Sequence, residues 1–199
     1  MASYYYLMSQ LPYLFYDEKA PMTSDHFKEL AASLLNKRDA ALMKFLSLDP
    51  NHDDTQSPSY EKPAPSTGCK FIDEWRNWER TLRLNLAKHR SLHLYHNEEG
   101  TVEPPVNPAD AYATAAIVYT QDGSPLDGEI LLDKARWAAI DLMAGNDYFD
   151  RNFAFAFCLK LLLLERRQLF DADSGFSEYK SLYNEIVENS HKNIPGETI

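Results

Sequence analysis

The sequence predicts an all-α protein made of helical lobes in two loosely repeated halves. Large apolar side chains recur every three or four residues, which is the period of a helix with one buried face. Stretches rich in Pro, Ser and Asp separate these segments, as expected of loops between helices. The chain has 199 residues, of which 44% are hydrophobic and 25% charged, and this is enough for a core without disulfides. We expect one all-helical domain over residues 1–199, with one lobe at 1–95 and the other at 107–190.

The chain opens on an aromatic stretch, residues 3–16, whose pattern fits a strand as well as a helix. Pro12 is expected to end or kink whatever precedes it. Residues 22–36 then predict a helix, because Thr23 or Ser24 is a good N-cap and leucines follow at helical spacing. A second, shorter helix is predicted over residues 38–48, before an Asp-Pro pair.

A long loop and a long helix complete the first half. Residues 50–68 are rich in Pro, Ser and Asp and predict a loop or linker. Residues 69–94 predict a helix of unusual length for this chain. Its apolar positions recur at steps of four and three, and they define a buried stripe of Phe71, Trp75, Trp78, Leu82 and Leu86.

The second half repeats the plan of a loop followed by helices. A helix is predicted from Asn107-Pro108 to about residue 120, since Pro suits the first helical turn, although its last apolar residues would also suit a strand. Residues 121–128 predict a turn. A clear helix follows over residues 130–145, and Gly145 is a plausible C-terminal cap.

Two more helices are predicted, over residues 147–170 and 177–190. The apolar face of the last helix contains Tyr179, Leu182, Tyr183 and Ile186. A weak internal repeat relates the two halves: residues 82–90 and 159–167 match at several Leu and basic positions with a constant offset. Chance similarity between two amphipathic helices explains this match equally well.

Charge is distributed unevenly along the chain. The net charge of −10 argues against general binding to nucleic acid or to an anionic membrane, because phosphate would be repelled. Residues 69–93 carry six basic and three acidic side chains, whereas residues 94–150 carry two basic and eleven acidic ones. The long helix therefore has a basic stripe, and Glu79 and Arg83 are spaced to form an ion pair.

We predict that this basic stripe binds an acidic partner, because guanidinium groups bind carboxylates in a bidentate fork. The alternative is a solvated face whose charges pair internally with the acidic residues 94–150. The residues predicted to contact a partner are Arg76, Arg80, Arg83 and Arg90, followed by Arg166 and Arg167.

Three histidines, His89, His93 and His96, would share one face if the long helix continued to include them. Three imidazoles could then hold a divalent metal. The alternative is a solvated or capping role at the C-terminal end of the helix, where the helix dipole favours a positive charge. We favour the capping role and expect no metal site and no cofactor.

The familiar short motifs of enzymes are absent from the sequence. It contains no phosphate-binding loop, no dinucleotide-binding glycine pattern, no H-E-x-x-H and no G-x-S-x-G. Cys69 and Cys158 form no disulfide framework or zinc pattern. The longest apolar stretch, residues 153–165, is interrupted by Lys160 and is too short to cross a bilayer. We therefore expect a cytoplasmic protein that is not an enzyme and does not insert into a membrane.

Three segments carry a resemblance to a known family. They are the opening YYYLMSQLP, the pattern F-x-x-x-W-x-x-W-E-R-x-L-R that begins at Phe71, and KLLLLERRQLFD at residues 160–171. Together they resemble an uncharacterised bacterial family that is encoded among the subunits of V-type ATP synthases. More distantly, the helix pattern is similar to the C subunit of V-type and archaeal rotary ATPases, the d subunit in eukaryotes. That subunit is all-helical and joins the rotor stalk to the membrane ring.

This resemblance implies a function in ion transport without catalysis. We expect a cytoplasmic accessory or C-like subunit of a V-type ATPase or ATP synthase, peripheral to the membrane, whose partners are the rotor stalk and the membrane ring. The alternatives are an assembly factor or regulator of that complex, or a metal-dependent enzyme built on the three histidines.

Overall fold

The computed structural model is helical, and it shows no strand in the part of the chain that it describes, residues 4–49, 63–95, 103–120, 124–169, 177–184 and 186–187. The predicted all-α class is therefore confirmed for these residues. By its internal contacts the chain divides into two compact units, Met1–Glu165 and Arg166–Ile199. The predicted pair of repeated lobes stays a prediction.

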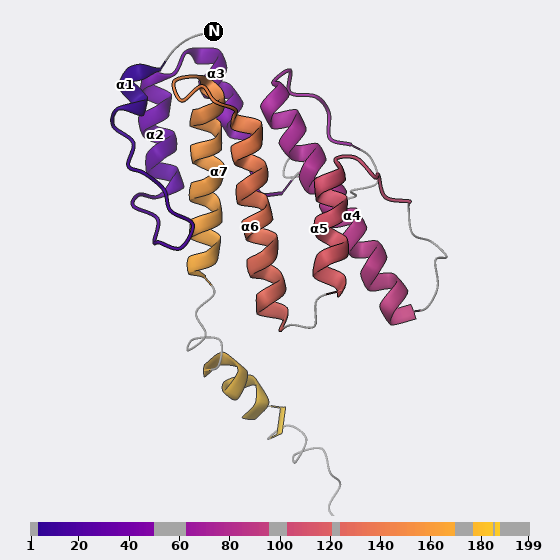
Figure 1. Ribbon diagram of the computed structural model, residues 1–199. Helices are drawn as coiled ribbons and strands as arrows, with labels where there is room; N and C mark the ends of the chain where they lie inside the picture. The colour runs from indigo at the N-terminus through magenta and orange to yellow at the C-terminus, as the bar shows by residue number, and fades with distance from the viewer. Residues whose placement is uncertain are drawn as a thin grey trace, which may run out of the picture. The chain divides into compact units, whose positions relative to one another are not determined.

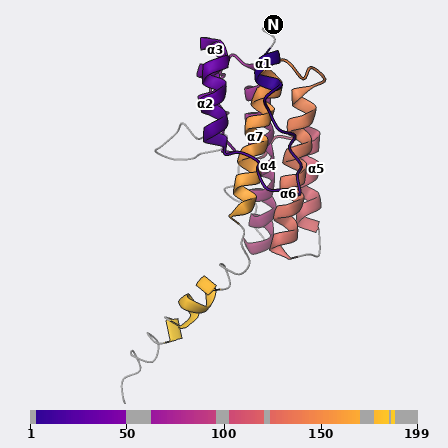
Figure 2. The same cartoon turned by 90° about the vertical axis from the view of Figure 1, so that its left-hand side faces the viewer.

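The helices are α1 (Tyr5–Met8), α2 (Ser24–Leu34), α3 (Lys37–Leu42), the 3-10 turn η1 (Met43–Phe45), α4 (Lys70–Tyr95), α5 (Ala109–Thr120), α6 (Pro125–Ala144) and α7 (Arg151–Gln168). Within the first unit, α7 lies between α2 and α6 (Figure 1). Helix α4 packs against α5 and α6. Figure 2 shows the segment that follows α1 running over α6 and α7.

Local signals explain where several helices begin. The Thr23 hydroxyl accepts a hydrogen bond from the His26 amide at 3.2 Å and caps α2, as predicted. Helix α6 begins at Pro125, so the predicted turn over residues 121–128 is wrong from residue 125 onward. Ser124 and Asp127 form a capping box there, and Pro125 occupies the first helical turn, so the helix starts five residues earlier than its apolar pattern.

Two further helices are shorter than predicted. Helix α7 begins at Arg151, four residues after the predicted start, because the Asp150 carboxylate accepts a hydrogen bond from the Phe153 amide at 2.9 Å and caps the helix there. The helix predicted over residues 38–48 tightens into η1 and ends at Phe45. Most of the predicted loop at 50–68 lies outside the described residues, as does Phe170. Of the helix predicted over residues 177–190, the described residues 177–184 and 186–187 are helical, and Glu185 and residues 188–190 lie outside the described part.

The core lies where the long helices meet. Every residue of the predicted stripe on α4 is buried. The Phe71 ring packs on Phe155 of α7 with 6.1 Å between centroids, and Phe27 of α2 packs on Phe157 at 4.8 Å. Helix α7 therefore contributes to the core on both of these sides, which explains why its sequence is apolar nearly all round.

A buried polar cluster ties the start of the chain to α3 and α7. The Tyr4 hydroxyl donates to Asp39 Oδ2 at 2.5 Å, and Asn36 Nδ2 donates to both the Tyr4 hydroxyl and Asp39 Oδ2. The Arg151 guanidinium lies 3.3 Å from Asp39 Oδ1. Burial and the hydrogen bond to Asp39 raise the pKa of Tyr4 to about 12.

This cluster predicts a stability difference that depends on pH. Replacing Tyr4 by Phe is expected to cost about 1.5–3 kcal/mol of unfolding free energy at pH 7, because a hydrogen bond to a charged acceptor is lost. The raised pKa means that Tyr4 stabilises the fold fully below pH 10 and loses this effect as the pH rises toward 12. Urea unfolding of both proteins at neutral and alkaline pH measures this, and a gap that stays constant would contradict it.

A second polar contact closes the N-terminal end of α2. Glu165 of α7 accepts a hydrogen bond from the Ser24 amide at 2.6 Å and one from the Ser24 hydroxyl at 2.7 Å. A carboxylate is favourable at a helix N-terminus because the first amides are unpaired and the helix dipole is positive there.

None of the helices among the described residues has the length and apolar character needed to cross a membrane.

Candidate functional site

The candidate site lies on the polar side of α4, where the predicted arginines are. The apolar stripe of α4 faces the core. The arginines lie beside this stripe, where their burial decreases from Arg76, which is buried, through Arg80 and Arg83, which are half-buried, to Arg90, which is exposed. At the start of the helix, Asp73 holds the preceding segment. Its carboxylate accepts hydrogen bonds from the Thr67 amide and hydroxyl, both at 2.8 Å, and from the Ser66 hydroxyl at 2.6 Å.

These contacts fix the charge of Asp73. Partial burial acts to raise the pKa of Asp73, but the hydrogen bonds from Ser66 and Thr67, together with the positive charge of Arg76, outweigh it and lower the pKa. Asp73 is therefore a carboxylate at neutral pH. Its oxygens accept hydrogen bonds from its own loop, and its charge also interacts with that of Arg76.

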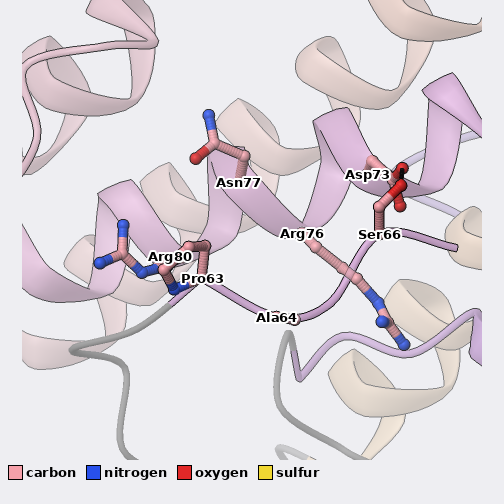
Figure 3. A pocket seen from close by; sticks show the side chains of 7 residues that line it. All are labelled: Pro63, Ala64, Ser66, Asp73, Arg76, Asn77 and Arg80. Atoms are coloured by element: carbon pink, nitrogen blue, oxygen red, sulfur yellow. Dashed lines mark hydrogen bonds between the residues drawn. The ribbon is translucent and has the colours of Figure 1, made fainter.

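A small cavity of about 110 Å³ lies between this loop and α4 (Figure 3). The side chains that line it include two guanidinium groups and one carboxylate. Figure 3 shows Arg76 and Arg80, which lie one turn apart on α4, extending away from each other. The lining residues are Pro63, Ala64, Ser66, Asp73, Arg76, Asn77 and Arg80.

Arg76 is mostly an internal anchor. Its side chain is buried, Nη2 donates to the Phe45 carbonyl at 3.4 Å, and the guanidinium carbon lies 5.4 Å from the centroid of the Phe45 ring. The arginine therefore holds η1 against α4. Arg80 is half-buried beside the same cavity, and this burial lowers its pKa.

Arg83 belongs to a buried ion-pair network. It donates from Nε to Glu79 Oε1 at 2.9 Å, as the spacing predicted, and from Nη2 to the Leu48 carbonyl at 3.0 Å. Glu79 is fully buried and also accepts a two-pronged contact from Arg136 of α6, at 3.0 and 3.1 Å. Arg136 in turn donates to Asp133 at 2.9 Å.

Charge balance within this network is favourable. Burial acts to lower the pKa of Arg136, but the charges of Glu79 and Asp133 and their hydrogen bonds outweigh burial and raise it. Arg136 therefore remains a cation inside the protein. The network joins α4 to α6 through acidic Glu79 and basic Arg136, so these contacts pair no arginine of the basic stripe with an acidic side chain of residues 94–150.

The other predicted arginines are not among the residues that line this cavity. Arg90 is exposed near the end of α4 and lines a separate hollow of about 280 Å³ with residues of α5 and α6. Arg166 and Arg167 are half-buried and belong to the second compact unit. The structure thus brings Arg76 and Arg80 together at one cavity, whereas a partner-binding role for any of the six stays a prediction.

The histidine hypothesis is only partly within the described residues. His89 stacks on Tyr119 of α5, with ring centroids 4.9 Å apart. The His93 side chain and all of His96 lie outside the described part. Among the side chains that the structure describes, no group of three His, Cys, Asp or Glu residues is placed to hold a metal.

The two cysteines are buried. Burial, the largest cause, raises the pKa of Cys158 to about 12, so this thiol stays protonated at neutral pH. A protonated, buried thiol is a poor nucleophile.

Sequence reasoning missed Asp133 and Arg136 as partners of the long helix. A signal was available in the sequence: both residues lie in a helix beside apolar positions, one turn apart with opposite charge.

Comparison with family models, with curated proteins and with solved structures finds no match to this chain.

Proposed function

We propose that this protein is a non-catalytic docking subunit that binds an acidic segment of a partner on the Arg80 side of α4. The observation that carries this proposal is the charge of the cavity between α4 and its preceding loop. Two guanidinium groups and one carboxylate line it, and the guanidinium of Arg80 is the half-buried one. Such a guanidinium can donate a two-pronged hydrogen bond to a carboxylate of a partner.

The two arginines point away from each other, which favours an extended acidic segment over a single small anion. Arg80 is the more accessible of the two and would make the principal contact. Its half-burial strengthens a new ion pair, because water screens a partly buried charge less than an exposed one.

The partner that we propose is another subunit of a V-type ATPase or ATP synthase, at the junction of the rotor stalk and the membrane ring in the cytoplasm. The resemblance of YYYLMSQLP, the Trp-Glu-Arg helix and KLLLLERRQLFD to proteins encoded with that complex supports this choice. A linking role needs rigid helices and a broad surface, and α4, α6 and α7 are cross-linked by buried rings and ion pairs. On this proposal the two lobes are repeats of the C-subunit kind.

Charge reversal at Arg80 tests the docking claim. Arg80→Glu is expected to reduce co-purification with the other ATPase subunits by at least tenfold, because attraction is replaced by repulsion of like charges. Lys70→Glu is the matched control, since Lys70 is highly exposed at the start of the same helix. Arg83 is a poor choice for reversal, because a glutamate there would face buried Glu79.

Recovery is measured by quantitative pull-down from cells in which the tagged protein is expressed at its native level. Stoichiometric recovery supports a stable subunit, and substoichiometric recovery that still depends on Arg80 supports the assembly factor or regulator instead. If Arg80→Glu folds and is recovered with its partners as well as the wild type, the docking claim is removed.

A further inference from the structure

A second, chemically different surface lies on the other side of the core. It is a groove of about 370 Å³ between the segment that follows α1, helix α6 and helix α7. Figure 2 shows that segment running over the two helices. The walls of the groove are mostly apolar and aromatic, and they include Leu11, Tyr13, Trp137, Tyr148 and Phe157.

The rim of the groove carries large aromatic side chains that are exposed to water. The Tyr13 side chain is 79% exposed and Tyr148 is 62% exposed. Tyr148 is held by an edge-on contact with Phe153, whose centroid lies 5.4 Å away. Tyrosines that are exposed yet supported by a neighbour are typical anchors of protein interfaces, because they bury much area for little loss of side-chain freedom.

One charged pair lies inside this apolar surface. The Lys160 ammonium lies over the Trp137 ring, 4.6 Å from its centroid, and donates to Asp141 Oδ1. The Lys160 side chain is 15% exposed, whereas that of Asp141 is 54% exposed. A ligand that enters the groove therefore meets the carboxylate, while the lysine is already covered by a ring and paired with an anion.

Asp141 and Lys160 are the two charged residues among the side chains described as lining this groove. The accessible electrostatic preference of the groove is thus for a cation.

We propose that this groove binds a partner segment that carries large apolar side chains and a lysine or arginine. The apolar side chains lie between Tyr13 and Tyr148, and the basic group pairs with Asp141. This site is independent of the proposed docking of an acidic segment on α4, and its charge preference is the opposite one. A protein with both sites can hold two different partners at once.

Selection of random-sequence peptides displayed on phage, with the full-length protein as the target, tests the proposal. The selected peptides are expected to share large apolar residues and at least one Lys or Arg. Their affinities are then measured by fluorescence anisotropy against four variants. Tyr148→Ala is expected to weaken binding at least tenfold, and Asp141→Asn about three- to fivefold.

The asparagine variant keeps an oxygen for Lys160, so it removes the charge without leaving the lysine unpaired. Matched controls are Asp25→Asn, an exposed carboxylate on α2, and Tyr112→Ala on α5, and both should leave affinity within twofold. Replacing the basic residue of the peptide by Gln should abolish the difference between the wild type and Asp141→Asn.

Four results would overturn the proposal. They are the absence of any selected peptide, selected peptides without a basic residue, binding that is insensitive to Tyr148→Ala, and a groove occupied by a second copy of the chain. Light scattering would reveal the last as a dimer that Tyr148→Ala dissociates.

Discussion

Replacing Glu79 by alanine is expected to lower the free energy of unfolding by about 3–5 kcal/mol. Glu79 is fully buried and accepts hydrogen bonds from both Arg83 and Arg136. Its removal leaves Arg136 as a buried cation with Asp133 as its remaining acidic partner in this network. The loss of one member of a buried ion pair costs far more than the pair itself contributes, because the remaining charge has lost its water and keeps only part of its compensating interactions.

Urea unfolding followed by circular dichroism measures this effect. Glu74→Ala is the matched control on the same helix, since Glu74 is exposed and forms an ion pair with exposed Lys70 at 3.6 Å, and it should change stability by less than about 0.5 kcal/mol. If the variant is too unstable to fold, Glu79→Gln keeps the shape and should lie between the two. Equal stabilities of Glu79→Ala and Glu74→Ala would contradict the network.

Replacing Trp78 by alanine is expected to cost about 3–5 kcal/mol, through lost burial and the cavity that remains. Trp78 is almost completely buried and stacks on Trp75, with 5.8 Å between ring centroids and 10° between planes. Its indole Nε1 donates to Asp110 Oδ2 at 2.7 Å, which fixes the first turn of α5 against α4. The substitution therefore weakens both the core and the contact between these two helices.

Two comparison variants separate these contributions. Trp78→Phe keeps an aromatic ring but loses the donor, so it should cost less than the alanine variant, and hydrogen exchange should show faster opening of α5. Tyr112→Ala, which alters an exposed ring on α5, should cost less than about 1 kcal/mol. If Trp78→Ala had the same free energy of unfolding as Tyr112→Ala, the stacked tryptophans would not contribute to the stability of the core as we expect.

The sequence predicted best what a single helix determines by itself. The stripe from Phe71 to Leu86 is buried because its spacing matches the helical period, and the Glu79–Arg83 pair forms because both residues lie on one helix. The start of α6 was misplaced because the apolar pattern begins at residue 130, six residues after Ser124, the first residue of the capping box. Caps are made by short polar signals, which periodicity does not detect.

What the sequence could not predict depends on contacts between distant segments. Arg136 lies 57 residues from Glu79, and no spacing rule relates them. Both interpretations of the basic stripe, as a partner surface or as a solvated face, placed its arginines at the surface, whereas Arg76 is buried. The groove has walls from three separate segments of chain, and Lys160 looked only like an interruption in an apolar run. Its partner Asp141 lies 19 residues away on another helix.

The bond between Ser24 and Glu165 has a consequence for how the chain is made. The two residues are 141 positions apart, and Glu165 is translated last. Helix α2 therefore leaves the ribosome long before the Glu165 carboxylate can bind its N-terminal amide. During that interval Phe27 has no Phe157 to cover it. Because these contacts form late, we expect the nascent chain to bind chaperones through its uncovered apolar residues. Slowing translation before residue 165 should lengthen the time for which chaperones stay bound.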